Sequence, residues 1–425
     1  MATLHPFRAL RPNPDHAARI AAVPYDVVST DEARALAADN ALSFLRVSRA
    51  ELELPAGTDP YANDVYERAA ANFDALRQKA LRVEDEPSVY VYQLRMGSHV
   101  QTGLAACFSL DEYDGNVIKK HERTRRDKED DRTRHMLALG AQTGPVFLTY
   151  RAAADVDAVA ARATAGPPII DFTADDGVQH TIWRIGGADR DALVAAFARI
   201  PALYIADGHH RAASAARAHH EMRERGVKGT PLGDGADAST MLAVAFPHDQ
   251  VQILPYNRTV KDLGGLAPDE FMEKVRERFE VASGPAATTE PEARSGQNRD
   301  ATPAKRGDIA MYFQGRWHTL RPRSLPDPSD AIGSLDVSVL QEGLLAPILK
   351  IADVRTDKRI DFVGGARGTT ELEKLVDSGK AGVAFSLYPV SVADLMAVSD
   401  AGAIMPPKST WFEPKLRDGL LIHVI

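Results

Sequence analysis

At 425 residues the chain is longer than one ordinary hydrophobic core, and domains of roughly 100–200 residues predict two or three of them. Its 44% hydrophobic and 26% charged residues are typical of a soluble globular protein, and the net charge of -8 argues against a broad basic surface for duplex DNA. The only cysteine, Cys107, excludes an intramolecular disulfide and a cysteine-based zinc site.

The N-terminus, residues 1–20, has no apolar core of signal-peptide length. No apolar run reaches the ~18 residues of a membrane span. We therefore expect a cytoplasmic protein that does not engage a membrane.

Residues 1–85 are expected to form an N-terminal α/β segment. AARIAAVPYDVVS, residues 17–29, predicts a strand and a turn, since Pro24 restricts the residue before it to an extended conformation. Ser29 and Glu32 have the spacing of a capping box, which predicts that a helix begins there.

Polar side chains interrupt two pieces of this segment. PYDVVS places Asp26 in the turn, and LSFLRVSRAE, residues 42–51, predicts a strand that carries Arg46 and Ser48. Such side chains either brace the scaffold or face a site, and the pattern leaves both roles open.

A helix and a hairpin follow. Residues 59–81 have apolar side chains at the three-to-four spacing of an amphipathic helix. Residues 88–110 predict two strands joined by a turn at Gly97 and Ser98. The second strand holds Cys107 among apolar neighbours, which indicates a buried structural thiol.

Strands and helices alternate along the rest of the chain, which predicts a mixed α/β (α+β) fold. Residues 86–260 are expected to form a nucleotide- or phosphate-binding core, and residues 261–425 a C-terminal α/β domain. Within the latter, residues 284–306 are rich in Pro, Ala, Thr and charge and predict a loop or linker. The stretch GAIMPPKSTWFEPKLRDGLLI, residues 402–422, either braces a site or closes a domain interface.

The segment ALYIADGHHRAASAARAHHEMRERG predicts a strand, a tight turn at Asp207 and Gly208, and a helix. A helix N-terminus holds anions, because its first N–H groups point outward and its dipole favours negative charge. Gly208 would let the backbone approach a phosphate closely. Donors would come from the next three residues, His209, His210 and Arg211. The alternative is that Asp207 caps a helix whose polar first turn is solvated.

A metal site at this turn has less support. His209 and His210 are adjacent, so on a helix they point about a third of a turn apart, and neither has a histidine partner at i+4 spacing. Asp207 could still help to hold magnesium through a bound nucleotide.

A charged segment, KKHERTRRDKEDDRTRH, covers residues 119–135 and contains 8 Lys or Arg, 5 Asp or Glu and 2 His. Such runs are usually solvated helices laced with i,i+4 ion pairs. Here Glu122 lies within a cluster of cations, which keeps a carboxylate ionised and suits it to bind a metal, position a hydroxyl or accept a proton. The basic side chains could clamp phosphate oxygens. Both interpretations stay open.

Familiar nucleotide and hydrolase motifs are missing from the sequence. VGGARGTT, residues 363–370, lacks the glycine spacing and the lysine of G-x-x-x-x-G-K-[ST], and no G-x-S-x-G elbow occurs. A phosphoryl-transfer enzyme with this sequence would bind the nucleotide phosphates with a loop of an uncommon kind.

Seven stretches in colinear order resemble the bacterial DUF1015 family over residues 7–418: RALRP, PYDVVS, SFLRVSR, KKHERTRRDKEDDRTRH, LYIADGHHR, LPYNR and MPPKSTWFEPKL. That family is distantly similar to the ParB/sulfiredoxin-like group, which includes nucleotide-dependent kinases of free L-serine. The resemblance implies a ParB/sulfiredoxin-like nucleotide-binding core with an additional α/β C-terminal domain. It also implies a phosphate-binding turn at residues 208–211.

The leading hypothesis is therefore a serine kinase that transfers the ATP γ-phosphoryl group to the hydroxyl of free L-serine. Mg²⁺ with ATP is the expected cofactor, with ADP as an alternative donor. We expect no protein-only metal site, since Mg²⁺ would be held through the nucleotide, with Asp207 or Glu122 as its protein ligand.

Roles for individual residues follow from this hypothesis. The candidates for catalysis are His121, Glu122 and Asp207, with Glu122 or Asp207 as the base. The candidates for binding nucleotide phosphates are Gly208, His209, His210, Arg211, Lys119, Arg123, Thr124 and Arg125. The candidates for gripping the amino acid are Asp26, Arg46 and Ser48, because an arginine fork pairs well with a carboxylate.

Two alternatives belong to other classes. One is a nucleotide-binding regulator without turnover or a ParB-like DNA-binding module, although the negative charge makes a nucleic-acid partner unexpected. The other is a metal-dependent hydrolase that uses Asp207, His209 and His210. A homodimer is compatible with the sequence.

Overall fold

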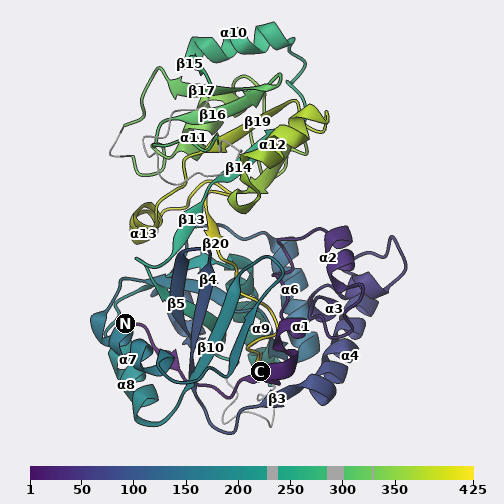
Figure 1. Cartoon of the computed structure of the whole chain (residues 1–425), viewed down its shortest axis with the longest axis vertical. Helices are drawn as coiled ribbons and strands as arrows, with labels where there is room; N and C mark the ends of the chain where they lie inside the picture. Colours follow the sequence, from purple (N-terminus) through teal and green to yellow (C-terminus); the bar gives the residue numbers. More distant parts are fainter. Residues whose placement is uncertain (227–237, 285–300, 328–329) are drawn as a thin grey trace. The chain divides into compact units, whose positions relative to one another are not determined.

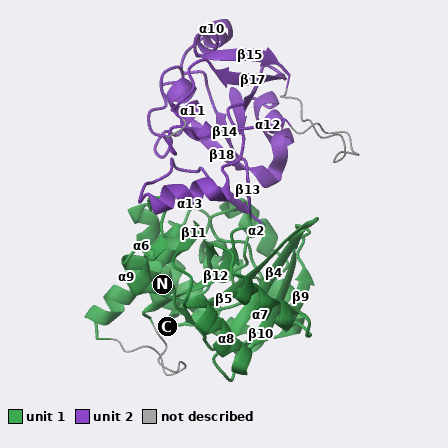
Figure 2. Ribbon diagram, turned by 90° about the vertical axis from the view of Figure 1, so that its left-hand side faces the viewer, with its two compact units in different colours: residues 1–251, 414–425 green, residues 252–413 purple. Residues whose placement is uncertain are grey.

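The structure is a computed structural model that describes residues 1–226, 238–284, 301–327 and 330–425. Two compact units divide the chain (Figure 2): unit 1 comprises Met1–Val251 and Pro414–Ile425, and unit 2 comprises Gln252–Glu413. Each unit combines helices with a sheet. The predicted mixed α/β fold with an additional C-terminal α/β part is therefore confirmed.

Unit 1 is built on a nine-stranded mixed sheet (Figure 1) with the order β6-β11-β8-β12-β5-β4-β10-β9, and β1 also pairs with β5. Its strands are β1 (Leu4–His5), β4 (Val89–Met96), β5 (His99–Ser109), β6 (Ile118–Lys119), β8 (Val146–Tyr150), β9 (Ile170–Thr173), β10 (Gln179–Ile185), β11 (Leu203–Asp207) and β12 (Thr240–Pro247). The predicted hairpin is β4 and β5, and Cys107 is buried on β5 as expected.

Helices supply the rest of the unit 1 core. Its helices are α1 (Ala17–Ile20), α2 (Thr30–Ala37), α3 (Leu45–Ser48), α4 (Asn63–Ala80), α5 (Leu110–Asp114), α6 (Arg126–Leu139), α7 (Ala154–Thr164), α8 (Gly187–Phe197) and α9 (His209–Glu224), with short 3-10 turns at Pro14–His16 and Ala50–Glu53. Helix α6 packs against both α4 and α9. The capping box of Ser29 and Glu32 is present at α2 as predicted. Among the described residues, every helix is too short or too polar to cross a bilayer.

Two predicted strands near the N-terminus are wrong. Residues 17–29 begin with helix α1 rather than a strand, and residues 42–51 contain helix α3. In the second case Phe44, Leu45 and Val47 are all buried against the neighbouring helices, and their spacing fits a helical turn as well as a strand. The turn predicted around Asp26 is present.

The C-terminal tail, residues 414–425, belongs to unit 1. The predicted division at residues 85 and 260 placed this tail in the C-terminal domain instead. Asp418 and Ala22 bridge through their backbones, with Asp418 N–H donating to Ala22 O at 2.9 Å. Strand β21 (His423–Val424) then pairs with β7 (Ala141–Gln142), and β2 (Leu10–Pro12) pairs with β3 (Leu81–Val83). The predicted N-terminal segment and core are therefore one unit.

Unit 2 has its own six-stranded sheet, with the order β15-β17-β16-β19-β14-β18. Its strands and helices are β14 (Tyr256–Val260), β15 (Phe279–Ser283), β16 (Ile309–Phe313), β17 (Arg316–Pro322), β18 (Ile360–Gly364), β19 (Val383–Leu387), α10 (Pro268–Arg278), α11 (Asp336–Leu340), α12 (Gly368–Asp377) and α13 (Val392–Asp400). Strands β13 (Gln252–Leu254) and β20 (Trp411–Glu413) form a separate pair. Most of the linker predicted at 284–306 lies outside the described residues.

Candidate functional site

Parallel pairing of β6 with β11 brings two distant segments of the sequence together. In this register Ile118 lies opposite Leu203 and Lys119 opposite Tyr204. Parallel strands end at the same edge of a sheet. The loop at residues 120–125, which follows β6, therefore lies beside the turn that follows β11.

Gly208 forms the turn between β11 and α9. Its φ of 91° is left-handed, a conformation that glycine adopts without steric cost, and it is the N-cap residue of α9. No side chain caps the helix there, so the alternative in which Asp207 is the cap is wrong. The N–H groups of the first turn of α9 have no carbonyl partner within the helix, which gives the turn the polarity of an anion site.

Gly208→Ala is expected to lower the free energy of unfolding by roughly 1–3 kcal/mol, because alanine is strained at this φ and its Cβ would lie 2.9 Å from Arg211 Nε. Gly177→Ala is the matched control: its φ is +79°, and no atom lies within 4 Å of the added Cβ. Urea unfolding of both variants measures the difference. Equal losses would show that the contact with Arg211 is unimportant.

Asp207 is placed between two cations. Its Oδ2 lies 3.2 Å from Arg211 Nη2 and 3.5 Å from Lys415 Nζ. Burial opposes ionisation, but Lys415 and Arg211 together hold the pKa of Asp207 well below its ordinary value. A carboxylate of this kind is a weak base and a suitable oxygen ligand.

The histidines predicted to donate to phosphate are instead tied to the 120–125 loop. The rings of His121 and His209 meet edge to face with centroids 4.4 Å apart, and both are buried. His209 Nε2 accepts a long hydrogen bond from the backbone N–H of His121, at 3.5 Å, and His210 Nε2 accepts one from Arg125 N–H at 3.0 Å. Burial lowers the pKa of His121 to about 4 and that of His209 well below its ordinary value, so both rings are neutral at pH 7.

Glu122 is the carboxylate that faces this pair. Its Oε2 lies 3.9 Å from His209 Nδ1, and its side chain is 31% exposed. Ligand atoms of His121, Glu122 and His209 all lie within 4.8 Å of one another, which could hold a metal ion. This set differs from the predicted one of Asp207, His209 and His210.

The charged segment divides into a loop and a helix. Within α6, Asp131 binds Arg132 and Tyr66, and Arg217 of α9 pairs with Glu129 and Asp130. These acidic side chains hold α6 against α4 and α9, as expected if this half of the charged segment has a structural role.

The loop half of the segment also contains basic and polar side chains. Arg123 and Arg125 are exposed, and Arg125 also pairs with Asp127 at 2.8 Å. Thr124 Oγ1 donates to Glu129, whereas Lys119 is partly buried on β6. Arg123 and Arg125 are therefore the exposed basic side chains of this loop.

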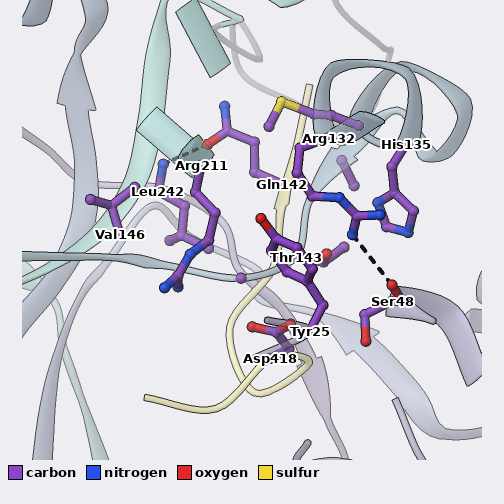
Figure 3. A pocket seen from close by; sticks show the side chains of 13 residues that line it. Tyr25, Ser48, Arg132, His135, Gln142, Thr143, Val146, Arg211, Leu242 and Asp418 are labelled. Carbon is purple, nitrogen blue, oxygen red and sulfur yellow. Dashed lines mark hydrogen bonds between the residues drawn. The ribbon is translucent and has the colours of Figure 1, made fainter. Parts of the chain in front are cut away.

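A polar cavity of about 40 Å³ lies in unit 1, beside α9 (Figure 3). It is lined by Tyr25, Ser48, Arg132, His135, Met136, Ala141, Gln142, Thr143, Gly144, Val146, Arg211, Leu242 and Asp418. The Arg132 guanidinium lies 4.2 Å from the centre of the Tyr25 ring and donates to Ser48 O at 3.3 Å. The C-terminal tail supplies Asp418, and α9 supplies Arg211.

The three predicted substrate-binding residues lie in different places. Ser48 lines the cavity. Asp26 is exposed, and its charge adds to the effect of burial in raising the pKa of Asp418. Arg46 is not at the cavity: it donates to Asn40 O at 3.0 Å and pairs with Glu53 at 2.6 Å, so its role is to brace the N-terminal helices.

Sequence reasoning missed Lys415 and Asp418. Both lie in the stretch at 402–422, which was expected either to brace a site or to close a domain interface. The dipeptide of Asp418 and Gly419 was the available signal, since Asp-Gly marks a tight turn. Nothing local indicated which strand or helix this turn would meet.

Comparisons with known proteins give a family and weak structural likenesses. The family described as "Protein of unknown function (DUF1015)" matches residues 4–338. No curated protein matches the chain. A free serine kinase in complex with AMP is 14% identical, with a TM-score of 0.35, and the match covers 74% of this chain and 92% of that one.

Two further solved structures are similar at the same level. A conserved hypothetical protein from Pyrococcus furiosus is 12% identical, with a TM-score of 0.34 and coverage of 75% and 95%. SbnI from Staphylococcus aureus, with a C-terminal truncation, is 12% identical, with a TM-score of 0.36 and coverage of 75% and 87%. Because these scores are low, function has to be inferred from the geometry of this chain.

Proposed function

The chain belongs to the DUF1015 family, and on that premise we propose that it is a kinase that transfers the γ-phosphoryl group of ATP to the hydroxyl of free L-serine. The observation that carries the proposal is that the loop at residues 120–125 lies beside the turn at Gly208. The Gly208 turn opens α9, and the Glu122 carboxylate lies 3.9 Å from the first residue of that helix. L-serine as the acceptor follows from the family resemblance.

The nucleotide phosphates would lie at the first turn of α9. Backbone N–H groups of residues 209–211 would donate to their oxygens, with Arg123 and Arg125 approaching from the loop. Asp207 offers carboxylate oxygens, the ligands that Mg²⁺ prefers, and Mg²⁺ would neutralise phosphate charge there.

Glu122 is the proposed base. The serine hydroxyl oxygen attacks the γ-phosphorus, the bond from that phosphorus to the β-phosphate oxygen breaks, and ADP leaves. The hydroxyl proton passes to Glu122, which is partly exposed. Asp207 is less suited to this role, because Lys415 and Arg211 stabilise its ionised form.

Phosphoryl transfer from labelled ATP with Mg²⁺ tests the proposal directly, with L-serine, homoserine, threonine and inositol offered as acceptors. We expect labelled O-phosphoserine as the main product. Nucleotide binding without transfer to any acceptor would indicate a regulator. Failure to bind nucleotide at all would overturn the phosphate site.

A metal-dependent hydrolase is the second candidate, because His121, Glu122 and His209 bring three ligand atoms within 4.8 Å of one another. Neutral imidazoles and a carboxylate suit zinc or manganese. Elemental analysis of the purified protein separates the two candidates, since one tightly bound zinc or manganese per chain is not expected of the kinase.

A further inference from the structure

The cavity beside α9 contains polar atoms with unused hydrogen-bonding capacity. Among the described residues, Ser48 Oγ, Arg211 Nε and Asp418 Oδ1 are buried and have no hydrogen-bond partner. Buried polar groups in native proteins are nearly always hydrogen-bonded, since an unpaired one costs roughly 1–3 kcal/mol. The three atoms belong to residues that line one cavity, so a single small polar ligand there would complete their hydrogen bonds.

The chemistry of these atoms is specific. Arg211 Nε can only donate, and the other nitrogens of the same guanidinium already bind Pro145 O and Asp207. An ionised Asp418 Oδ1 can only accept, and a hydroxyl such as Ser48 Oγ does either. A ligand that satisfies all three therefore carries both a hydrogen-bond acceptor and a hydrogen-bond donor.

Charge strengthens the same conclusion. Asp418 is 4% exposed and Arg211 is 8% exposed, so both interact with a ligand at low dielectric. Burial raises the pKa of Asp418 to about 7, which leaves its two forms balanced near neutral pH. A cation beside Oδ1 would favour the carboxylate.

We infer that this cavity recognises the charged head of a small α-amino acid, with Asp418 Oδ1 accepting from its ammonium group and Arg211 Nε donating to its carboxylate. Ser48 Oγ lies at the same cavity and completes the set. A volume of about 40 Å³ has room for roughly three water-sized groups, which is compatible with the ammonium and carboxylate of such a molecule. The inference adds an amino-acid-binding site to the proposed function. It rests on that function only for the transfer of the phosphoryl group to the hydroxyl of the bound amino acid.

Arg211 links the cavity to the phosphate turn. Its Nη2 lies 3.2 Å from Asp207 Oδ2, and its guanidinium packs so closely that a Cβ on Gly208 would lie 2.9 Å from Nε. Arg211 therefore lines the cavity and also packs against the turn. Arg211 would then bind the amino acid that receives the phosphoryl group, rather than the nucleotide phosphates as predicted.

Asp418→Asn is the decisive substitution, because asparagine keeps the shape of the side chain and loses the charge. Calorimetry with L-serine, glycerate and ethanolamine measures each head group, since glycerate lacks the ammonium and ethanolamine lacks the carboxylate. The wild-type protein is expected to bind L-serine about 100-fold more tightly than either. In Asp418→Asn, L-serine affinity falls about 100-fold while glycerate affinity hardly changes.

Two further variants separate recognition from folding. Asp336→Asn makes the same change at a buried carboxylate of unit 2 and is expected to leave L-serine binding intact. Gly144→Ala places a Cβ 2.4 Å from Asp418 Oδ1, so the Asp418 carboxyl group must shift while the charge stays the same, and L-serine binding is expected to weaken at least tenfold. ATP binding should be unchanged in all three variants.

The outcomes distinguish this inference from the proposed function. Tight L-serine binding that depends on Asp418, without phosphoserine formation, would keep the amino-acid site and overturn the kinase. Equal loss of L-serine and glycerate binding in Asp418→Asn would refute ammonium recognition, whether or not the protein is a kinase. No binding of L-serine by the wild-type protein would refute the site.

Discussion

Glu122→Gln is expected to reduce phosphoryl transfer from ATP to L-serine by roughly 10²–10⁴-fold, the range that a positioned base contributes. The amide keeps the shape of the side chain and cannot accept the hydroxyl proton. Since the Glu122 side chain is 31% exposed, the free energy of unfolding should change by less than about 1 kcal/mol. Initial rates at saturating ATP and a urea titration measure the two quantities.

Asp207→Asn gives the contrasting result. Turnover should also fall, but this variant leaves Arg211 and Lys415 without their carboxylate partner, so it should lose stability as well. Glu67→Gln, on the exposed side of α4, is the control and should alter neither quantity. Full activity in both Glu122→Gln and Asp207→Asn would refute the assignment of roles.

Local patterns were enough to predict the elements that carry the turn. The apolar run of β11, the left-handed glycine and the helix after it are encoded within about twenty residues, and the hairpin of β4 and β5 is equally local. The charged segment could be recognised as unusual. Its division at Arg126 into a loop and a helix could not, because α6 is held by partners on α4 and α9.

The cavity could not be predicted, because its walls come from distant parts of the chain. Ser48 lies on a segment that reads as a strand and folds as a helix. Asp418 arrives from the C-terminal tail through a backbone bridge to Ala22. Arg46 was a natural candidate for a carboxylate fork, yet backbone carbonyls and Glu53 use its donors. Sequence alone contains no signal for such long-range pairings.

Stability is expected to rise steeply with pH between about pH 4.5 and 6, because unit 1 buries several imidazoles in their neutral form. Burial lowers the pKa of four histidines, to about 4 for His121, about 4 for His135, about 3 for His180 and well below the ordinary value for His209. In this window the unfolded chain binds protons at these four positions and the folded chain does not, so raising the pH favours the folded state.

Two buried carboxyls act in the opposite direction. Burial raises the pKa of Asp418 to about 7 and that of Asp336 to about 6, so the folded state holds protons there that the unfolded state has released. Their contribution to stability is lost as the pH rises. Four imidazoles against two carboxyls leave a net difference of about two protons, which corresponds to roughly 3 kcal/mol per pH unit. Burial also lowers the pKa of His318 and raises that of Asp157, and these two groups act in opposite directions.

Urea unfolding at a series of pH values measures this slope, and single variants apportion it. His180→Gln should reduce the slope by roughly 1.4 kcal/mol per pH unit, whereas Asp418→Asn should increase it by a similar amount, because it removes an opposing proton. A flat profile across the window would mean that the imidazoles are hydrated in the folded protein, which would also remove the neutral His121 and His209 pair from the candidate site.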